Sequence, residues 1–279
     1  MYRKILVGLD RQGRAEQALP VVAALARRSL AEVVLLHVRA AGANGELPGA
    51  ADVRLAAVVD RLEAEGVRAH AEVLATALPV PRAIVDAARR LGADLVALGS
   101  HGRGDLAGLV LGSVGHRVAA RLDCPILLVH AGCREAGRRP IQRLLVAVDD
   151  SEEARCAVET AACLAAEHRA AVLVVHALQP ESIRRRGYAD AWNAASDLVE
   201  AASERFPQPW DSVQTLLLPG PGPVAARLAA AADTWDADLI VAGSRRLTDL
   251  GGLLLGSVAH DLVRRTRRPV LLADRAPAP

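Results

Sequence analysis

The chain has 279 residues, of which 52% are hydrophobic and only 2% aromatic, so a large core must be built mainly from alanine, leucine and valine. The formal net charge of +2 argues against a protein dedicated to nucleic acid, because such proteins carry strongly basic faces. No run reaches the roughly 18 apolar residues of a membrane-spanning helix, and the first residues lack a signal-peptide pattern. We therefore expect a cytoplasmic protein that does not bind membranes or nucleic acid.

The first half of the chain alternates between short β-rich runs and stretches with apolar residues at helical spacing. The pattern predicts strands at residues 4–9, 33–38, 68–74, 94–98 and 125–129. Helices are predicted between them, over residues 18–26, 53–62, 81–91 and 114–122. Strands that alternate with helices form parallel sheets covered on both faces, so the pattern predicts an α/β fold with a five-stranded parallel sheet.

The same pattern returns in the second half of the chain. Ile5-Leu-Val-Gly-Leu-Asp10 reappears 139 residues later as Leu144-Leu-Val-Ala-Val-Asp149. Asp94-Leu-Val-Ala-Leu-Gly-Ser100 reappears 144 residues later as Asp238-Leu-Ile-Val-Ala-Gly-Ser244, so five residues are inserted between the two matches. This period is far longer than that of a solenoid repeat, and it predicts two tandem domains, at residues 1–131 and 141–275.

A glycine-rich segment, Gly99 to Ser113, connects the predicted strand at 94–98 to the next helix. Glycines let backbone N–H groups approach a ligand, and a helix amino terminus adds free N–H groups and a partial positive charge. The segment thus suits a phosphate group. No Gly-Lys-Ser/Thr follows, so it is not a Walker A loop. A glycine-rich turn that binds nothing remains the alternative.

The spacing Gly99-x2-Gly102-x9-Gly112-Ser113 resembles the motif of the nucleotide-binding universal stress proteins. The apolar run ending in Asp10, the pair His37-Val38 and the entry of Pro125 into the last strand are also similar to that family. The resemblance implies a Rossmann-like, adenine nucleotide alpha hydrolase-like fold with strand order 3-2-1-4-5 in each domain. It further implies that the two halves pair through their fifth strands as an intramolecular pseudo-dimer, with homodimers left open.

The resemblance also implies a binding site for ATP, with Mg²⁺ held through the ATP phosphates. Asp10 would contact the ribose, the Val38 backbone the adenine, and the glycine motif the phosphates. In the first domain the expected site residues are Gly8, Leu9, Asp10, Val38, Leu98, Gly99, His101, Gly102, Arg103, Gly112, Ser113 and Val114. The alternative for Asp10 is that it only caps the following helix. One departure from the family lies there, since Arg11-Gln-Gly13 stands where Gly-Ser-Glu is common.

The second domain carries a departure of its own. Its expected site residues are Asp149, Gly243, Gly256, Ser257 and Val258. Arg246 stands where the first domain has Gly102. An arginine is poorly suited to a position that needs a positive φ or a close backbone approach, and its side chain could fill the space of the phosphates. We therefore expect a weak second site and one tight ATP per chain. The alternative is that Arg245 or Arg246 binds phosphate directly, because guanidinium groups suit phosphate.

The sequence predicts binding in preference to catalysis. It shows no nucleophile paired with a general base and no cluster of metal ligands, so we assign neither catalytic nor metal-binding residues. The leading hypothesis is an ATP-binding stress-response regulator with an unknown protein partner and slow or no hydrolysis. A slow ATPase and an interaction module that binds no nucleotide are the alternatives. The four cysteines are interpreted as buried, inert thiols.

Overall fold

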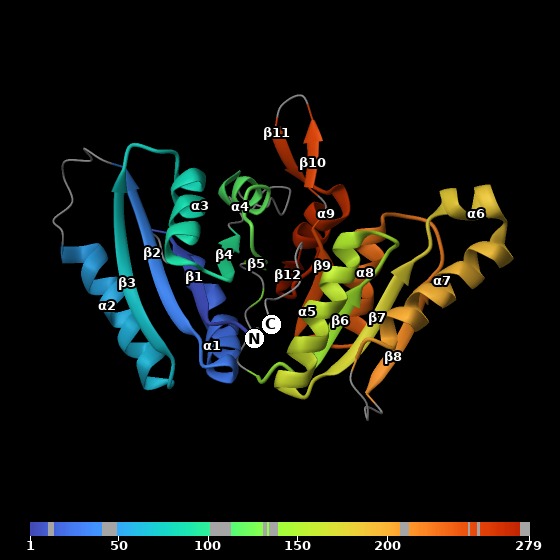
Figure 1. Cartoon of the computed structure of the whole chain (residues 1–279), viewed down its shortest axis with the longest axis horizontal. Helices are drawn as coiled ribbons and strands as arrows, with labels where there is room; N and C mark the ends of the chain where they lie inside the picture. Colours follow the sequence, from blue (N-terminus) through green and yellow to red (C-terminus); the bar gives the residue numbers. More distant parts are fainter. Residues whose placement is uncertain are drawn as a thin grey trace. The chain divides into compact units, whose positions relative to one another are not determined.

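The computed structural model describes residues 1–10, 14–40, 49–100, 113–130, 133, 139–206, 212–244, 246–249 and 252–273. The chain forms two compact units: the first comprises residues 2–139 together with residues 248–254, and the second comprises residue 1 with residues 140–247 and 255–279. Each unit alternates strands and helices as the sequence predicts (Figure 1). The His101, Gly102, Arg103 and Gly112 positions of the expected site lie outside the described residues.

The first unit begins with a strand, a short 3-10 helix and an α-helix, and then alternates regularly. Its elements are β1 (Lys4–Leu9), η1 (Arg14–Ala18), α1 (Leu19–Ser29), β2 (Glu32–Ala40), α2 (Gly49–Ala64), β3 (Arg68–Thr76), α3 (Val80–Leu91), β4 (Leu95–Ser100), α4 (Ser113–Ala119) and β5 (Ile126–His130). The second half of the chain follows the same plan, and its described elements also include α6, β10 and β11. Its elements are β6 (Arg143–Ala147), α5 (Glu152–His168), β7 (Ala171–Ala177), α6 (Pro180–Arg186), α7 (Tyr188–Ser203), β8 (Val213–Leu218), α8 (Val224–Thr234), β9 (Leu239–Gly243), β10 (Arg246–Asp249), β11 (Gly252–Leu255), α9 (Ser257–Arg265) and β12 (Val270–Ala273).

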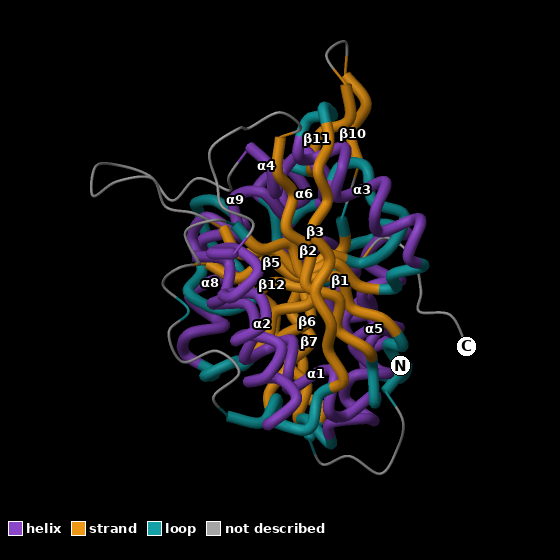
Figure 2. The backbone as a smooth tube through the Cα atoms, turned by 90° about the vertical axis from the view of Figure 1, so that its left-hand side faces the viewer, coloured by secondary structure: helices purple, strands orange, loops and turns teal. Residues whose placement is uncertain are grey.

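The strands pair in the order predicted from the family resemblance. In the first unit the order is β3-β2-β1-β4-β5, and the second unit repeats it as β8-β7-β6-β9-β12. The pairs within each unit are parallel. Right-handed crossovers place α1 and α2 on one face of the first sheet and α3 and α4, which pack together, on the other. In each unit the strands form a layer with helices on either side (Figure 2).

The central strands are buried on both faces, which explains why they read as continuous apolar runs instead of alternating patterns. Ile5, Leu6 and Val7 of β1 have no exposed surface, and neither have Leu144, Leu145 and Val146 of β6. Aliphatic side chains of this size fill the space between a sheet and its helices without aromatic residues. The composition and the architecture therefore agree.

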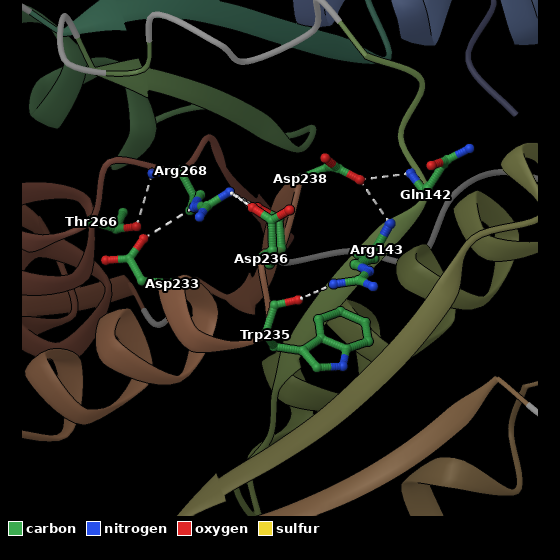
Figure 3. Close-up of polar contacts among 9 residues, drawn as sticks. Gln142, Arg143, Asp233, Trp235, Asp236, Asp238, Thr266 and Arg268 are labelled. Atoms are coloured by element: carbon green, nitrogen blue, oxygen red, sulfur yellow. Dashed lines mark hydrogen bonds and ion pairs between the residues drawn. The ribbon is translucent and has the colours of Figure 1, made fainter.

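One hydrogen-bonding arrangement recurs at the amino-terminal edge of both sheets. The Asp94 carboxylate accepts from the backbone nitrogens of Arg3 at 2.8 Å and Lys4 at 3.1 Å. In the second unit, Asp238 accepts from the backbone nitrogens of Gln142 at 2.8 Å and Arg143 at 2.9 Å (Figure 3). The repeat seen in the sequence thus extends to individual side-chain contacts.

The two units differ in how the chain enters its first α-helix. In the second unit Ser151 caps α5, its hydroxyl accepting from the backbone nitrogen of Ala154 at 3.2 Å. In the first unit η1 precedes α1, and the N-cap residue Ala18 makes no side-chain bond to the helix. The difference follows from the sequence, because Asp150-Ser-Glu152 supplies a capping residue that Arg11-Gln-Gly13 lacks.

The residues after β9 also adopt a conformation that the glycine pattern did not predict. Arg246 begins β10, which pairs with β11 as a separate two-stranded sheet. Strand backbone has negative φ, so Arg246 is not at a position that requires glycine. A positive φ at Arg246 therefore does not explain a weak second site, which stays a prediction.

The environments of the cysteines also correct the sequence analysis. Cys133 is buried, but Cys124 and Cys156 are only partly buried and Cys163 is exposed, so the expectation of four buried thiols is wrong.

Within the described part of the chain, every helix is too short or too polar to cross a membrane.

Candidate functional site

A pocket of about 190 Å³ lies in the second unit at the carboxyl ends of β6, β7 and β9. In open parallel sheets this edge is where ligands bind. All five residues expected in the second-domain site line this pocket. They are Asp149, Gly243, Gly256, Ser257 and Val258.

The amino terminus of α9 forms one wall of this pocket. Gly256 is the N-cap residue, and its carbonyl accepts the first helical bond, from the backbone nitrogen of His260 at 2.9 Å. The N–H groups of the first turn, from Ser257 onward, therefore have no acceptor within the helix. Such a helix end favours an anion, because free N–H groups and the helix dipole act together.

Asp149 also lines this pocket and lies two residues after the end of β6. Its Oδ1 accepts from the backbone nitrogen of Ser151 at 3.0 Å and also from the Ser151 hydroxyl. Ser151 is also the cap of α5, so the carboxylate is tied to the start of that helix. A ligand hydroxyl that bonds to this Asp149 oxygen competes with Ser151.

His176, near the end of β7, completes the polar part of the pocket. Its Nδ1 lies 2.8 Å from the carbonyl oxygen of Val148, which fixes the orientation of the ring. His37 holds the equivalent place in the first unit, with Nδ1 3.2 Å from the carbonyl oxygen of Leu9. Both histidines therefore connect the second strand of their sheet to the end of the first.

Gly243 and its counterpart Gly99 lie so close to neighbouring backbone that neither position has room for a side chain. A Cβ on Gly243 would lie 2.7 Å from the Glu153 carbonyl carbon and 2.8 Å from the Ala154 nitrogen. A Cβ on Gly99 would lie 2.6 Å from the Cα of Ala15. Real Cβ atoms do not approach backbone this closely, so each glycine allows the helical segment that follows the first strand, η1 or α5, to pack against the fourth strand of its sheet.

The first unit brings its described site residues to the corresponding edge. Gly8 and Leu9 end β1, where Gly8 pairs with Leu98 on β4, while Asp10 follows directly. Val38 lies on the neighbouring strand β2, Gly99 on β4, and Ser113 and Val114 begin α4. The backbone nitrogen of Ala15 donates to Asp10 Oδ1 at 3.4 Å, which supports the alternative that Asp10 serves the start of the next helical segment.

Sequence reasoning missed several residues of the second-unit pocket. His176, Ser151 and Gln179 line it, as do the apolar side chains of Val224 and Leu228. A signal for His176 was present, because the histidine recurs at the end of the second strand in both halves. Gln179 had no such signal, since its counterpart 139 residues earlier is Ala40. Among the residues that the structure describes, no group of three or more His, Cys, Asp or Glu is placed to hold a metal ion.

Comparison with known proteins identifies the family. The model of the universal stress protein family matches residues 1–130 and again residues 140–274. A universal stress protein of Mycobacterium tuberculosis is 28% identical over 191 residues, which are 66% of this chain and 63% of that protein. The match therefore spans less than two thirds of that relative.

Solved structures share the fold. A universal stress protein from Archaeoglobus fulgidus has a TM-score of 0.74 at 21% identity and covers 98% of both chains. Another universal stress protein, solved in complex with cAMP, is 28% identical, with a TM-score of 0.37, and covers 47% of this chain and 98% of its own. Because the family model matches nearly the whole chain in two consecutive copies, the chain belongs to the universal stress protein family, as a tandem of two such domains.

Proposed function

We propose that this chain binds ATP, with one tight site in the first unit and a weaker site in the second, and that it acts as a nucleotide-dependent regulator. The observation that carries nucleotide binding is the convergence of Asp149, Gly243 and Gly256 to Val258 on a single pocket. That pocket offers an acceptor for a ribose at one end and a helix amino terminus for phosphate at the other. The first unit keeps the equivalent strand ends together and carries the full glycine motif in its sequence.

Two features support a weaker second site. The pocket holds about 190 Å³, whereas sites for small molecules typically measure about 300 to 1,000 Å³. The Asp149 carboxylate is bonded to both the backbone and the hydroxyl of Ser151, so a ribose hydroxyl must compete for it.

Binding without rapid turnover follows from the chemistry of the pocket. Its described titratable side chains are Asp149 and His176, and each is directed to a neighbour within the fold. Asp149 also accepts from the Ser151 hydroxyl, but that hydroxyl oxygen is held by the backbone nitrogen of Ala154 as the cap of α5. A bound ATP would bring Mg²⁺ on its own phosphates.

Calorimetry on the full chain tests the proposal. We expect ATP with Mg²⁺ to bind at one tight site per chain, and GTP to bind more weakly. Gly102→Arg should abolish the tight site, whereas Gly104→Arg, which adds the same charge at a variable position of the motif, should retain it. Arg246→Gly should leave the tight site unchanged. Two equal sites, or tight binding that survives Gly102→Arg, would show that the assignment is wrong. Phosphate release well above the Gly102→Arg background would instead support an ATPase.

A further inference from the structure

The second unit contains another hollow, which shares no lining residue with the candidate pocket. It measures about 510 Å³ and lies between the edge strand β8 and helix α8. Gln214 and Leu216 line it from the strand, and Arg227, Thr234 and Trp235 line it from the helix and its end. Its size is that of a site for a small organic molecule. None of its described lining residues is acidic.

Arg227 has an unusual environment at the wall of this groove. Its Nη1 donates to the carbonyl oxygen of Leu218 at 2.6 Å. Its Nε and Nη2 are enclosed and have no hydrogen-bond partner among the described residues. Burial lowers the pKa of Arg227 below its usual value, and no carboxylate acts in the other direction. Two enclosed guanidinium nitrogens without an acceptor are unfavourable, and an anion that reached them would remove that cost.

The equivalent place in the first unit is built differently. His37 pairs with Val73 and His176 pairs with Leu217, so positions on β8 lie 144 residues after their counterparts on β3. By that correspondence Leu216 replaces Glu72, Thr234 replaces Arg90, and Arg227 replaces Ala83.

Glu72 and Arg90 form an ion pair that joins β3 to α3 across the equivalent place. The second unit therefore lacks the pair that bridges strand and helix, and has gained an enclosed cation beside the groove.

We propose that the groove between β8 and α8 binds a small organic carboxylate with an apolar body. The carboxylate would bond to Nε and Nη2 of Arg227, which form the side-on fork that arginine uses for bidentate pairing. The body would lie against Leu216 and Trp235. Because both nitrogens are enclosed, binding has to draw the guanidinium further into the groove. Arg143 adds positive charge nearby, since its guanidinium carbon lies 5.8 Å from the centre of the Trp235 ring (Figure 3).

The probe is phenylacetate, titrated into the isotopically labelled full chain while the Arg227 Nε–H and Trp235 indole N–H signals are followed by NMR. We expect saturable shifts of both signals. The neutral analogue 2-phenylethanol and inorganic phosphate should produce neither shift. Arg227→Gln should weaken binding by about tenfold or more, because a charge-assisted pair is lost. Arg227→Lys should recover part of the affinity, and Arg186→Gln, which removes an exposed arginine of α6, should have no effect.

A second variant tests the comparison between the two units. Leu216→Glu combined with Thr234→Arg introduces the ion pair of the first unit and should abolish phenylacetate binding while the circular dichroism spectrum is retained. ATP titrations of the same samples should remain unchanged, which separates this proposal from the proposed nucleotide site. The proposal is overturned by the lack of saturable shifts in the unmodified chain. It is equally overturned by undiminished binding in Arg227→Gln, or by phosphate binding as well as phenylacetate.

Discussion

The Asp238 carboxylate accepts a hydrogen bond from the backbone nitrogen of Arg143 at 2.9 Å, although the two residues are 95 positions apart. The same oxygen accepts from Gln142, so one side chain joins the start of β6 to the start of β9. Asp94 makes the equivalent contacts with Arg3 and Lys4 in the first unit. A side chain is needed here because the amide groups at the start of a strand lack a partner in the sheet.

Replacing Asp238 should therefore destabilise the second unit. Asp238→Ala removes an ionised acceptor from two backbone donors, and we expect a loss of about 1–3 kcal/mol in the free energy of unfolding. Urea unfolding followed by circular dichroism measures it. Glu181→Ala, which removes an exposed pair with Arg184, serves as the control and should cost no more than about 0.5 kcal/mol. Equal effects of the two changes would contradict the role given to Asp238.

The close packing at Gly99 and Gly243 predicts a second effect on stability. Alanine at either position meets backbone that cannot move independently, so we expect each change to destabilise its unit by about 1–3 kcal/mol or more. Gly8→Ala is the matched comparison, because its Cβ would meet the Cδ2 of Leu98, a side-chain atom that can rotate away. If Gly99→Ala and Gly243→Ala unfold at the urea concentration of the unmodified chain, this explanation of the two glycines fails.

Leu30 offers a stabilising change. It ends α1 with φ of 56°, in the left-handed region that favours glycine, and its side chain is 75% exposed. Leu30→Gly should raise the free energy of unfolding by about 0.5–1 kcal/mol, because it relieves the strain and gives up little packing. Leu30→Ala keeps the Cβ and should not produce this gain. Thermal and urea unfolding of the two variants measure the free energy of unfolding, and an equal gain in both would contradict the explanation by strain at Leu30.

The environment of His260 predicts a pH dependence. Burial, followed by the charge of Arg264, lowers the pKa of His260 below its ordinary value of 6.5, and Asp261 only partly opposes this. The folded state thus favours the neutral ring. Its contribution to stability is fully present above the unfolded pKa and is lost as the pH falls towards the lower folded pKa.

Urea unfolding at a series of pH values from 7 to 5 tests this contribution, with the unmodified chain compared with His260→Gln. The variant should show a smaller loss of stability as the pH falls, because the replaced side chain does not titrate. Arg264→Gln should reduce the loss only in part, since burial is the larger cause. Parallel curves for all three proteins would exclude His260 as the origin of the pH dependence.

Much of the fold is predictable from this sequence, because the same alternation of strands and helices occurs in both halves of the chain. The runs ending in Asp10 and Asp149 are buried strands, and the alternation with helical stripes allows few arrangements besides a parallel sheet. The strand order came from the family resemblance, because local patterns do not determine which strands are neighbours.

The candidate site was less predictable. A glycine in a sequence signals a close approach, but it does not reveal whether a ligand or the chain itself approaches. At Gly99 and Gly243 the closely approaching atoms belong to the backbone of the chain itself. The two-stranded sheet of β10 and β11 was not predicted, because residues 247–255 were considered only as the spacing between Arg246 and Gly256. The groove beside Arg227 was also not predicted, because it is formed by residues of β8 and α8 together and no local sequence motif indicates it.

The capping of α5 by Ser151 has a consequence for how the chain folds. A capped helix of 17 residues nucleates more readily than α1, which has 11 residues and no side-chain cap. In pulse-labelling hydrogen exchange during refolding, we expect amide protection to appear over residues 152–168 before residues 19–29. Because the ribosome makes the first unit earlier, the order of synthesis and the order of helix formation would then run in opposite directions.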